Sequence, residues 1–260
     1  MDVSIIITNY KSERHLSRCI QALQSRSDGS LFEIIIINND TAPITSILPI
    51  ENIRLIENGI NEGFAKACNR GAKIAKGGIL FFLNPDTELI KGNITDLLAA
   101  LENKSVGIVA PQLTIPSGEI QKWSAGYEIN LCNTIKNNLG FIKGKNLWEQ
   151  NNIIEADWVS GAAFLIKKTL FDEISGFDEN FFMYFEDVDL CRRVKEKNLS
   201  ILVLPLIQVL HIGGQSFQNS ACKKKYYYAS QDYYFKKHFG NCSLFFLKLL
   251  RIPFLFFKKN

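Results

Sequence analysis

The stretch Val3-Ser4-Ile5-Ile6-Ile7-Thr8, at the start of the chain, decides the fold. Its nearly unbroken apolar character is typical of a strand that is buried on both faces, as in a parallel sheet covered by helices. Similar short apolar runs predict three further strands, at Glu33–Ile37, Ile53–Glu57 and Ile79–Leu83.

Helical patterns separate these strands. The first is a stripe with Ser12 as a candidate N-cap, formed by Leu16, Cys19, Ile20 and Leu23 at helical spacing. A second stripe runs from Phe64 to Ala75 and is expected to end at Gly77-Gly78. Alternating strands and helices predict an α/β fold with a mostly parallel central sheet flanked by helices.

Polar residues follow three of the predicted strands, as Thr8-Asn9-Tyr10, Asn38-Asn39-Asp40 and Asn84-Pro85-Asp86. In parallel α/β sheets, ligands bind beyond the carboxyl ends of the strands. These three segments therefore predict one binding site along that edge.

The second half of the chain is less regular. Residues 112–157 are rich in Asn, Lys and Gly and are interpreted as a loop-rich insertion. Trp158–Lys167 is expected to form one strand, and Thr169–Ser175 a short helix. Two more strands are expected at Ile201–Leu204 and Ile207–Ile212.

Three carboxylates, Glu186, Asp187 and Asp189, follow an aromatic run that begins at Phe181. Carboxylates beside apolar surface are costly unless they are paired, hydrogen-bonded or chemically employed. They are expected to begin a helix, whose dipole suits acidic residues. Asp187 is the candidate general base, and Glu186 either replaces it or orients an acceptor. Asp189 is expected to be structural, paired with an arginine one turn later.

A second acidic pair lies upstream, at Asp86 and Glu88. Alternate residues of an extended segment point the same way, so both could face one hard cation. Mg²⁺ or Mn²⁺ takes one or two carboxylates together with substrate phosphates. His211, followed by Gly213-Gly214, could ligate the same metal or contact phosphate. The expected metal residues are therefore Asp86, Glu88 and His211.

Bulk properties narrow the class of protein. The 260 residues carry a net charge of only +4, which does not by itself indicate nucleic acid as a partner. The six cysteines are scattered without a C-x-x-C pair, which indicates reduced thiols rather than a disulfide framework or a zinc site. No basic segment precedes the first strand, so a signal peptide is not expected. Glycine-rich dehydrogenase and P-loop signatures are absent from the sequence.

Taken in order, these motifs resemble those of the family 2 inverting glycosyltransferases, in the rhamnosyltransferase-like branch of bacterial surface polysaccharide and lipopolysaccharide biosynthesis. The similarity runs from about Val3 to Gly214. Its motifs are Thr8-Asn9-Tyr10, Asn61–Gly71, Leu83-Asn84-Pro85-Asp86, Val159-Ser160-Gly161-Ala162, Gly176-Phe177-Asp178-Glu179, Glu186-Asp187-Val188-Asp189, and His211 with Gly213-Gly214.

The resemblance implies a GT-A fold and a metal-dependent hexosyltransferase that uses a dTDP- or UDP-sugar donor. It makes Asp86 the metal-binding acid and Asp187 the catalytic base. The implied donor-binding residues are Thr8, Asn9, Tyr10, Asn38, Asn61, Gly63, Asn69, Asn84 and Asp86. The implied acceptor-binding residues are Trp158, Ser160, Gly161 and Asp178.

The chain departs from the family pattern at two positions. Asn38 stands where the family usually has an aspartate that contacts the nucleobase. An amide can still pair with a pyrimidine edge, but the preferred base is left open. Glu88 stands in the second acidic position of the metal motif, so it is either a direct ligand or a residue behind the ligands.

The expected glycosyltransferase domain covers residues 1–215, divided into a nucleotide-sugar half (1–111) and an acceptor and catalytic half (112–215). Residues 216–260 form a helical tail with an apolar stretch, Leu244–Phe257, and several lysines. Fourteen residues are too few to span a bilayer, which takes about 20. We expect the tail to contact the cytoplasmic face of the inner membrane, where a lipid-linked acceptor would lie. The alternative is a helix that packs on the core or in a homodimer.

Two other functions remain open from the sequence. One is a non-catalytic nucleotide-sugar-binding partner subunit, which the intact Asp86, Asp187 and His211 disfavour. The other is a nucleotidyltransferase, which would need a basic glycine-rich loop after the first strand. Thr8-Asn9-Tyr10-Lys11 provides no such loop.

Overall fold

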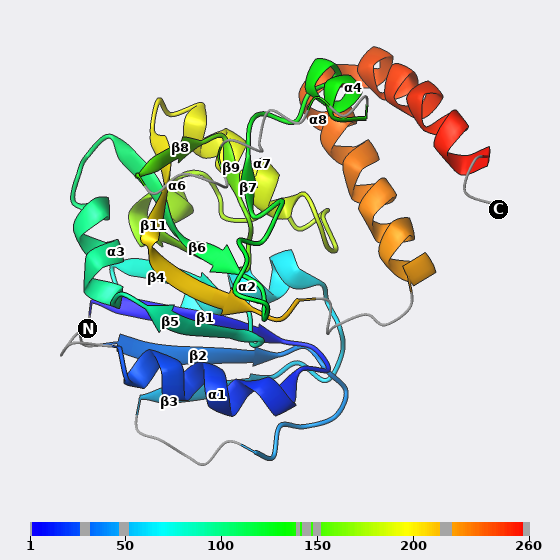
Figure 1. Ribbon diagram of the computed structural model, residues 1–260. Coiled ribbons are helices and arrows are strands. Elements are labelled where there is room, and N and C mark those ends of the chain that lie inside the picture. The colour runs from blue at the N-terminus through cyan, green and yellow to red at the C-terminus, as the bar shows by residue number, and fades with distance from the viewer. Residues whose placement is uncertain are drawn as a thin grey trace.

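The computed structural model describes residues 2–26, 32–46, 52–138, 141, 147, 152–213 and 220–256. Gly214 and residues 257–260, which belong to the motifs and the tail above, lie outside this part. A large sheet forms the centre, with helices on both faces and a long helix at the C-terminal end (Figure 1).

The N-terminal half contains a parallel sheet. Its strands are β1 (Val3–Asn9), β2 (Phe32–Asn38), β3 (Ile53–Glu57) and β4 (Ile79–Leu83), in the spatial order β3-β2-β1-β4. Both faces of β1 and β2 are buried along their whole length. The apolar runs therefore predicted these strands to within one residue at each end.

The second half extends the sheet with mixed pairing. β10 (Ala163–Lys167) runs antiparallel between β4 and β6 (Val106–Thr114). β11 (Ser200–His211) lies parallel to β6 and antiparallel to β5 (Thr87–Lys91) and β8 (Ile154–Ala156). Together these described strands make one nine-stranded sheet, which is flanked by a small pair, β7 (Ala125–Gly126) and β9 (Trp158–Val159).

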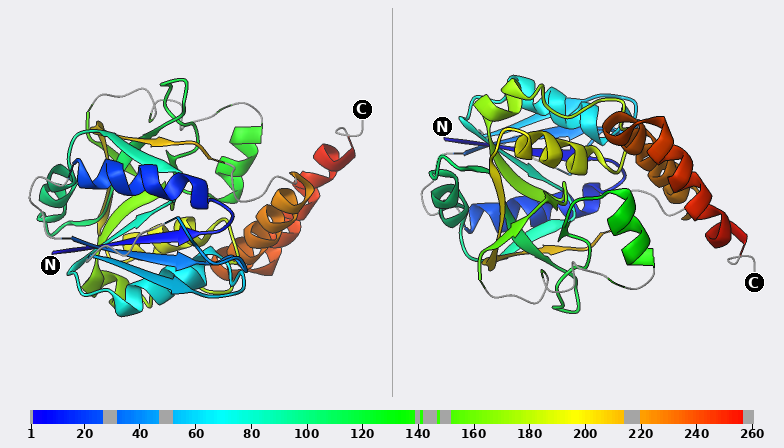
Figure 2. Two further views of the ribbon diagram at one scale, coloured as in Figure 1. Left: turned by 90° about the horizontal axis from the view of Figure 1, so that it is seen from below. Right: turned by 90° about the horizontal axis from the view of Figure 1, so that it is seen from above.

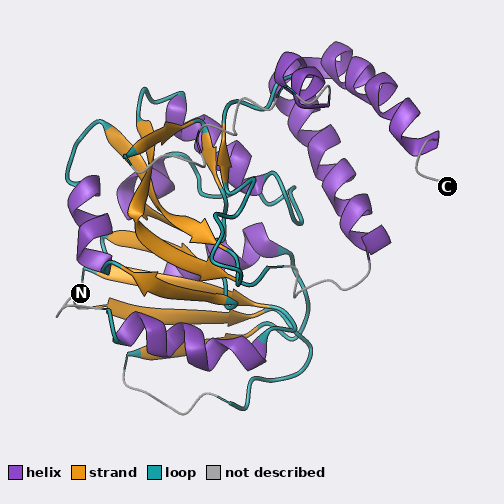
Figure 3. Cartoon of the chain, in the orientation of Figure 1, coloured by secondary structure: helices purple, strands orange, loops and turns teal. Residues whose placement is uncertain are grey.

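Helices cover the sheet on both faces, as Figure 3 shows. α1 (Glu13–Gln24) and α3 (Ile94–Leu101) pack on one face. α2 (Phe64–Ile74), α6 (Lys168–Glu173) and α7 (Glu186–Lys195) pack on the other. The predicted α/β class, with helices on both faces of a central sheet, is confirmed.

The structure corrects three expected elements. The expected strand Trp158–Lys167 is broken between β9 and β10, because the backbone at Gly161 turns to bind a side chain of α7. The two strands expected within 201–212 are one strand, β11, with an irregularity between Leu204 and Gln208. α2 ends at Ile74, before the expected Gly77-Gly78, because the next amides bind buried groups of β1 and β2: Lys76 N–H donates to Glu33 and Gly77 N–H to Ser4.

The segment 112–157 contains more structure than the expected loop-rich insertion. It includes the end of β6, the strands β7 and β8, and α4 (Leu131–Asn138). Gln121–Tyr127 and α4 lie at the edge of the cavity described below.

The C-terminal tail is helical, as expected. α8 (Ser220–Phe256) is bent at Gly240, whose φ of 79° is left-handed. The two parts of the helix fold back on each other, and the second leads away from the sheet (Figure 2). Arg251 on the second part binds Asp232 and Gln231 on the first. No helix of the described residues is both long enough and apolar enough to cross a membrane.

Candidate active site

A cavity of about 1140 Å³ opens at the carboxyl ends of β1 and β4. Its wall includes Thr8 and Tyr10 from the first predicted strand end, Asn84 and Asp86 from the last, and the start of α7. The sheet edge that the sequence predicted as a binding site is therefore the edge of the main cavity. α8 completes the wall with Lys223, Lys224, Tyr227, Tyr228, Gln231, Leu247, Leu250 and Arg251.

Asp187 lies in the first turn of α7 with both carboxylate oxygens fixed. Gly161 N–H donates to one oxygen at 2.8 Å, and Val188 N–H donates to the other at 2.8 Å. Burial raises the pKa of Asp187, against the opposing effect of these hydrogen bonds. A carboxylate that is half-buried and held in this way has the pKa direction expected of a general base.

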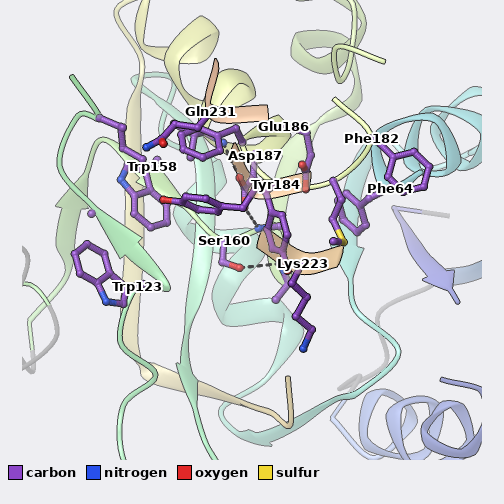
Figure 4. A pocket seen from close by; sticks show the side chains of 18 of the residues that line it. Phe64, Trp123, Trp158, Ser160, Phe182, Tyr184, Glu186, Asp187, Lys223 and Gln231 are labelled. Atoms are coloured by element: carbon purple, nitrogen blue, oxygen red, sulfur yellow. Dashed lines mark hydrogen bonds between the residues drawn. The ribbon is translucent and has the colours of Figure 1, made fainter. Parts of the chain in front are cut away.

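Glu186 precedes Asp187 and is buried at the cavity wall. Its Oε2 has no hydrogen-bond partner among the described residues. Burial, together with the neighbouring Asp187 charge, raises the pKa of Glu186 well above its usual value. Figure 4 shows Asp187 and Glu186 between two aromatic groups, with Trp123 and Trp158 on one side and Phe64 and Phe182 on the other.

The backbone before these acids is strained. Tyr184 and Phe185 have φ values of 69° and 67°, in the left-handed region that residues with side chains rarely adopt. Such strain costs about 1–3 kcal/mol per residue and persists only where the surroundings hold it. Phe185 is buried against Tyr234 and Tyr227 of α8, which supplies part of that hold. The turn starts α7 so that Glu186 and Asp187 both reach the cavity.

The residues of the aromatic run before the acids have different positions: some line the cavity and one packs on α8. Phe182 and Phe185 line the cavity, as the expected apolar wall. Phe181 instead packs against Tyr233 of α8. Asp189 is fully buried and binds Arg193 at 2.8 Å, so its expected structural role is confirmed.

Asp86 and His211 meet on the wall of the same cavity. Their Oδ1 and Nε2 atoms are 3.5 Å apart, and Gly213 N–H donates to the other Asp86 oxygen at 3.0 Å. Burial raises the pKa of Asp86, but the interactions with His211 and Gly213 outweigh it and hold the pKa below its usual value. Asp86 is therefore a buried anion at neutral pH.

The expected three-residue metal set is not assembled. Among the residues that the structure describes, no group of three or more His, Cys, Asp and Glu side chains is placed to hold a metal ion. Glu88 lies within β5 and is not on the cavity wall. Asp86 and His211 supply one carboxylate and one imidazole, a donor pair that suits Mn²⁺ or Mg²⁺ when substrate phosphates complete the coordination. Asp86 and His211 therefore fit the ion. The position of Glu88 off the cavity wall suits a residue behind the ligands better than a direct ligand.

Most of the expected donor-binding residues reach the cavity. Thr8, Tyr10, Asn61, Gly63, Asn84 and Asp86 line it. Three others lie behind the wall. Asn9 and Asn38 bind each other, and the Asn38 amide also donates to Ala42 and Glu57. Asn69 ties α2 to the backbone of Phe177.

Asn39 is the amide that lines the cavity after β2. Its side chain donates to the Gly63 carbonyl at 2.9 Å and so supports the start of α2. The sequence showed both amides but not which one faces the cavity. That choice depends on how the chain turns after β2, where Asn39 N–H donates to the carbonyl of Asn9.

Of the expected acceptor-binding residues, Trp158, Ser160 and Gly161 line the cavity. Asp178 does not; it binds Lys237 at 2.7 Å and Tyr233 at 3.0 Å and so fastens α8 to the core. Sequence reasoning missed Trp123, Tyr127 and the residues of α8 as cavity residues. The lysines and tyrosines of the tail were visible in the sequence, but they were interpreted as a membrane contact.

The comparison with known families decides the identity. The model of glycosyl transferase family 2 matches residues 4–189, which include the sheet edge, Asp86, Glu186 and Asp187. The chain belongs to glycosyltransferase family 2. The predicted family is thus confirmed, and glycosyl transfer is its class of activity.

Relatives with known roles agree with this family. The chain is 27% identical to the low-salt glycan biosynthesis hexosyltransferase Agl10 of Haloferax volcanii, over 81% of this chain and 67% of that protein. It is 26% identical to an N-acetylglucosaminyl-diphospho-decaprenol L-rhamnosyltransferase of Mycobacterium tuberculosis, over 80% and 75%. It is 24% identical to the dTDP-rhamnosyl transferase RfbF of Shigella flexneri, over 82% and 70%. Rhamnosyl- and hexosyltransferases of polysaccharide biosynthesis are therefore among its relatives.

Solved structures show the same fold. GalNAc-T7 with UDP, GalNAc and Mn²⁺ matches with a TM-score of 0.63 at 16% identity, over 90% of this chain and 50% of that one. Staphylococcus aureus TarS with UDP-GlcNAc matches with a TM-score of 0.55 at 17% identity, over 82% of this chain and 60% of that one. These likenesses support the expected GT-A architecture.

Proposed function

We propose that this glycosyltransferase is an inverting enzyme that moves a hexose such as rhamnose from a dTDP- or UDP-sugar to a glycan or lipid-linked acceptor. The observation that carries the proposal is the placement of one half-buried carboxylate, Asp187, with both oxygens fixed, in the same cavity as the Asp86–His211 pair. The position of Asp187 suits a base, and that of the Asp86–His211 pair suits a cation bound to the diphosphate of the donor.

The reaction assigns a role to each end of the cavity. Asp187 removes the proton from the acceptor hydroxyl while the oxygen of that hydroxyl forms a bond to the anomeric carbon of the donor sugar. The bond from that carbon to the diphosphate breaks, and its electron pair leaves with the diphosphate. Attack opposite the leaving group inverts the configuration of the sugar. The proton ends on Asp187, and the nucleoside diphosphate leaves.

Asp86 and His211 would hold Mg²⁺ or Mn²⁺ in this account. When bound, such an ion neutralises the diphosphate and makes it a better leaving group. His211 Nε2 lies 3.5 Å from Asp86 Oδ1, so one ion could contact both side chains. A metal ion binds the ionised carboxylate and the neutral imidazole, so protons compete with it and its affinity for the site should fall in acid.

The donor and the acceptor are proposed to occupy opposite ends of the cavity. Thr8, Tyr10 and Asn61 stand at the carboxyl ends of the parallel strands, where nucleotides bind in α/β sheets. Trp123 and Trp158 offer apolar ring faces suited to a sugar of the acceptor. Trp123 is half exposed and has a left-handed φ of 61°, a strain typical of functional positions.

The wall from α8 supports a lipid-linked acceptor. It combines the cations Lys223, Lys224 and Arg251 with apolar Leu247 and Leu250. This is the chemistry that an acceptor with a diphosphate and an aliphatic chain would need. The named substrate of one relative, N-acetylglucosaminyl-diphospho-decaprenol, belongs to this class. We accordingly propose contact with the cytoplasmic face of the inner membrane.

A panel of nucleotide sugars tests the function. Binding and slow hydrolysis of each donor would be measured by calorimetry and product release, with Mn²⁺, with Mg²⁺ and with a chelator. The proposal expects one dTDP- or UDP-hexose to bind, with hydrolysis that depends on the metal. If no nucleotide sugar binds under any of these conditions, the proposed function is wrong.

A further inference from the structure

The two adjacent acids of α7 differ in how their oxygens are paired. Both oxygens of Asp187 accept backbone N–H groups, which favours its ionised form. Glu186 Oε2 is buried and has no partner among the described residues. An ionised carboxylate oxygen left unpaired in an apolar wall is very costly, whereas a neutral acid costs far less.

The surroundings of Glu186 also favour its neutral form. They are the rings of Tyr184 and Phe185, the thiol of Cys68 on α2, and the Asp187 carboxylate. Burial raises the pKa of Glu186, the adjacent Asp187 charge raises it further, and no cation among these neighbours lowers it. The negative charge on Asp187 repels a second one on Glu186.

The two acids also face different ends of the cavity. Asp187 binds Gly161, beside Trp158 and Ser160 on the acceptor side. Glu186 lies toward Phe64 and Phe182 in Figure 4, and Phe64 begins α2, the helix that also carries Cys68. Cys68 in turn contacts Thr8, which lines the donor end of the cavity. Glu186 therefore stands between the base and the donor end, where the transferred sugar must lie.

We propose that Glu186 is a protonated carboxylic acid that donates a hydrogen bond to an oxygen of the transferred sugar, while Asp187 alone is the base. Glu186 keeps its proton throughout the reaction. Its neutrality leaves one negative charge at the acceptor and adds none beside the departing diphosphate. Its hydrogen bond orients the sugar for attack. This role rests on the proposed function, but the protonation state can be measured without any substrate.

The first test locates the proton by infrared difference spectroscopy on the full-length chain, at neutral pH and without substrate. The expected result is a carbonyl band of a protonated carboxylic acid that Glu186→Gln removes and Asp187→Asn retains. Glu173→Gln, at an exposed glutamate paired with Lys197, is the matched control and should retain the band. A band lost in Asp187→Asn but kept in Glu186→Gln, or no such band in the unaltered protein, would overturn the proposal.

The second test uses transfer rates, because an amide can replace the donor function of a neutral acid but not the charge of a carboxylate. Glu186→Ala should lower kcat/KM by roughly 10- to 100-fold, the cost of an unpaired buried hydrogen-bonding group. Glu186→Gln should recover at least about half of that loss on a logarithmic scale. Equal loss in both variants, with melting temperatures and nucleotide binding unchanged, would contradict the donor role. A protonated Glu186 in a protein that transfers no sugar would instead reject only the proposed function.

Discussion

At the scale of single residues, the cavity separates two kinds of carboxylate. Asp187 and Glu186 have raised pKa values because withdrawal from water disfavours their charged forms. Asp86 has a lowered pKa because His211 and Gly213 compensate for its burial. Titratable groups whose environments push their pKa values apart are typical of active sites. Here one end of the cavity suits a proton acceptor and the other suits a cation.

The metal end yields a residue-scale prediction. Asp86→Ala should weaken metal-dependent donor binding by about 10-fold or more, because it removes the carboxylate that faces the cation. Glu88→Gln should change that binding less than about twofold, since Glu88 is not on the cavity wall. Titration calorimetry of the nucleotide sugar at several Mn²⁺ concentrations measures both. An equal effect of the two substitutions would show that Glu88 is a ligand after all.

At the scale of elements, a close approach connects α2 with the turn before α7. Gly63, the N-cap residue of α2, has a φ of 89°, and a Cβ there would lie 2.6 Å from the carbonyl oxygen of Phe182. Phe64 N–H donates to that same carbonyl at 2.9 Å. The start of α2 and the turn before α7 are therefore held in one arrangement.

The close approach at Gly63 predicts the effect of adding a methyl group there. Gly63→Ala should lower the free energy of unfolding by about 1–3 kcal/mol, because it adds both strain and overlap. Gly78→Ala is the matched control: a Cβ there meets nothing within 4 Å, and the change should lie within about 1 kcal/mol of zero. Urea unfolding measures both variants. A Gly63→Ala protein as stable as the control would contradict the close approach.

A second element-scale feature is the attachment of α8 to α7. Lys237 lies between Asp178 and Asp189, at 2.7 and 2.6 Å, and His238 binds Asp189 at 2.7 Å. Burial raises the pKa of Asp178, but Lys237 and Asn180 lower it by more, so that the pKa falls from 3.8 to about 2. The pKa of Asp189 is lowered in the same way by His238, Arg193 and Lys237.

This attachment predicts how stability depends on pH. Because the folded-state pKa values lie below the unfolded ones, the contribution of these acids is fully present above about pH 4 and is lost as pH falls toward 2. Asp178→Asn should cost about 1 kcal/mol at pH 7 and make the acid loss shallower. Asp172→Asn, in an exposed pair with Lys168, is the control that should leave the slope unchanged. Unfolding curves at pH 7 and pH 3 measure the loss of stability in acid. An equal loss in the unaltered protein and in both variants would contradict the account.

The elements also show how far the sequence predicts the fold and the site. Uninterrupted apolar runs such as Ile79–Leu83 predict buried strands almost to the residue, because burial on both faces leaves little room for polar groups. The polar strand ends therefore predict the cavity edge. The break at Ser160–Ala162 could not be predicted, since it depends on Asp187, a residue far along the chain. Which of Asn38 and Asn39 faces the cavity could not be predicted either, because it depends on the contact of Asn39 with Asn9, which is distant in the sequence.

At the scale of the whole molecule, α8 forms part of the cavity wall. The sequence separated residues 216–260 as a tail, yet Ser230 donates to the carbonyl of Met183 and α8 lines the cavity over much of its length. The second part of α8 exposes Phe245, Phe246 and Leu249. Exposed apolar side chains beside lysines suit a lipid interface. Both alternatives for the tail therefore find support in different parts of one helix.

Vesicle flotation tests the membrane contact without removing the cavity wall. Serine at Phe245, Phe246 and Leu249 should weaken binding to anionic phosphatidylglycerol vesicles by about 10-fold or more, because the buried apolar area is lost. Serine at Ile153 and Leu206, which are equally exposed but far from α8 in sequence, is the matched control and should bind as the unaltered chain does. Equal flotation of both variants would reject the proposed contact.

The central claim is that the cavity is a glycosyltransferase site in which Asp187 is the base. The most direct measurement compares transfer to an acceptor by the unaltered chain and by Asp187→Asn, with the same nucleotide sugar and Mn²⁺. The account predicts a loss of transfer of about 10²- to 10⁴-fold, with nucleotide affinity largely kept. Transfer by Asp187→Asn at the rate of the unaltered chain would contradict it.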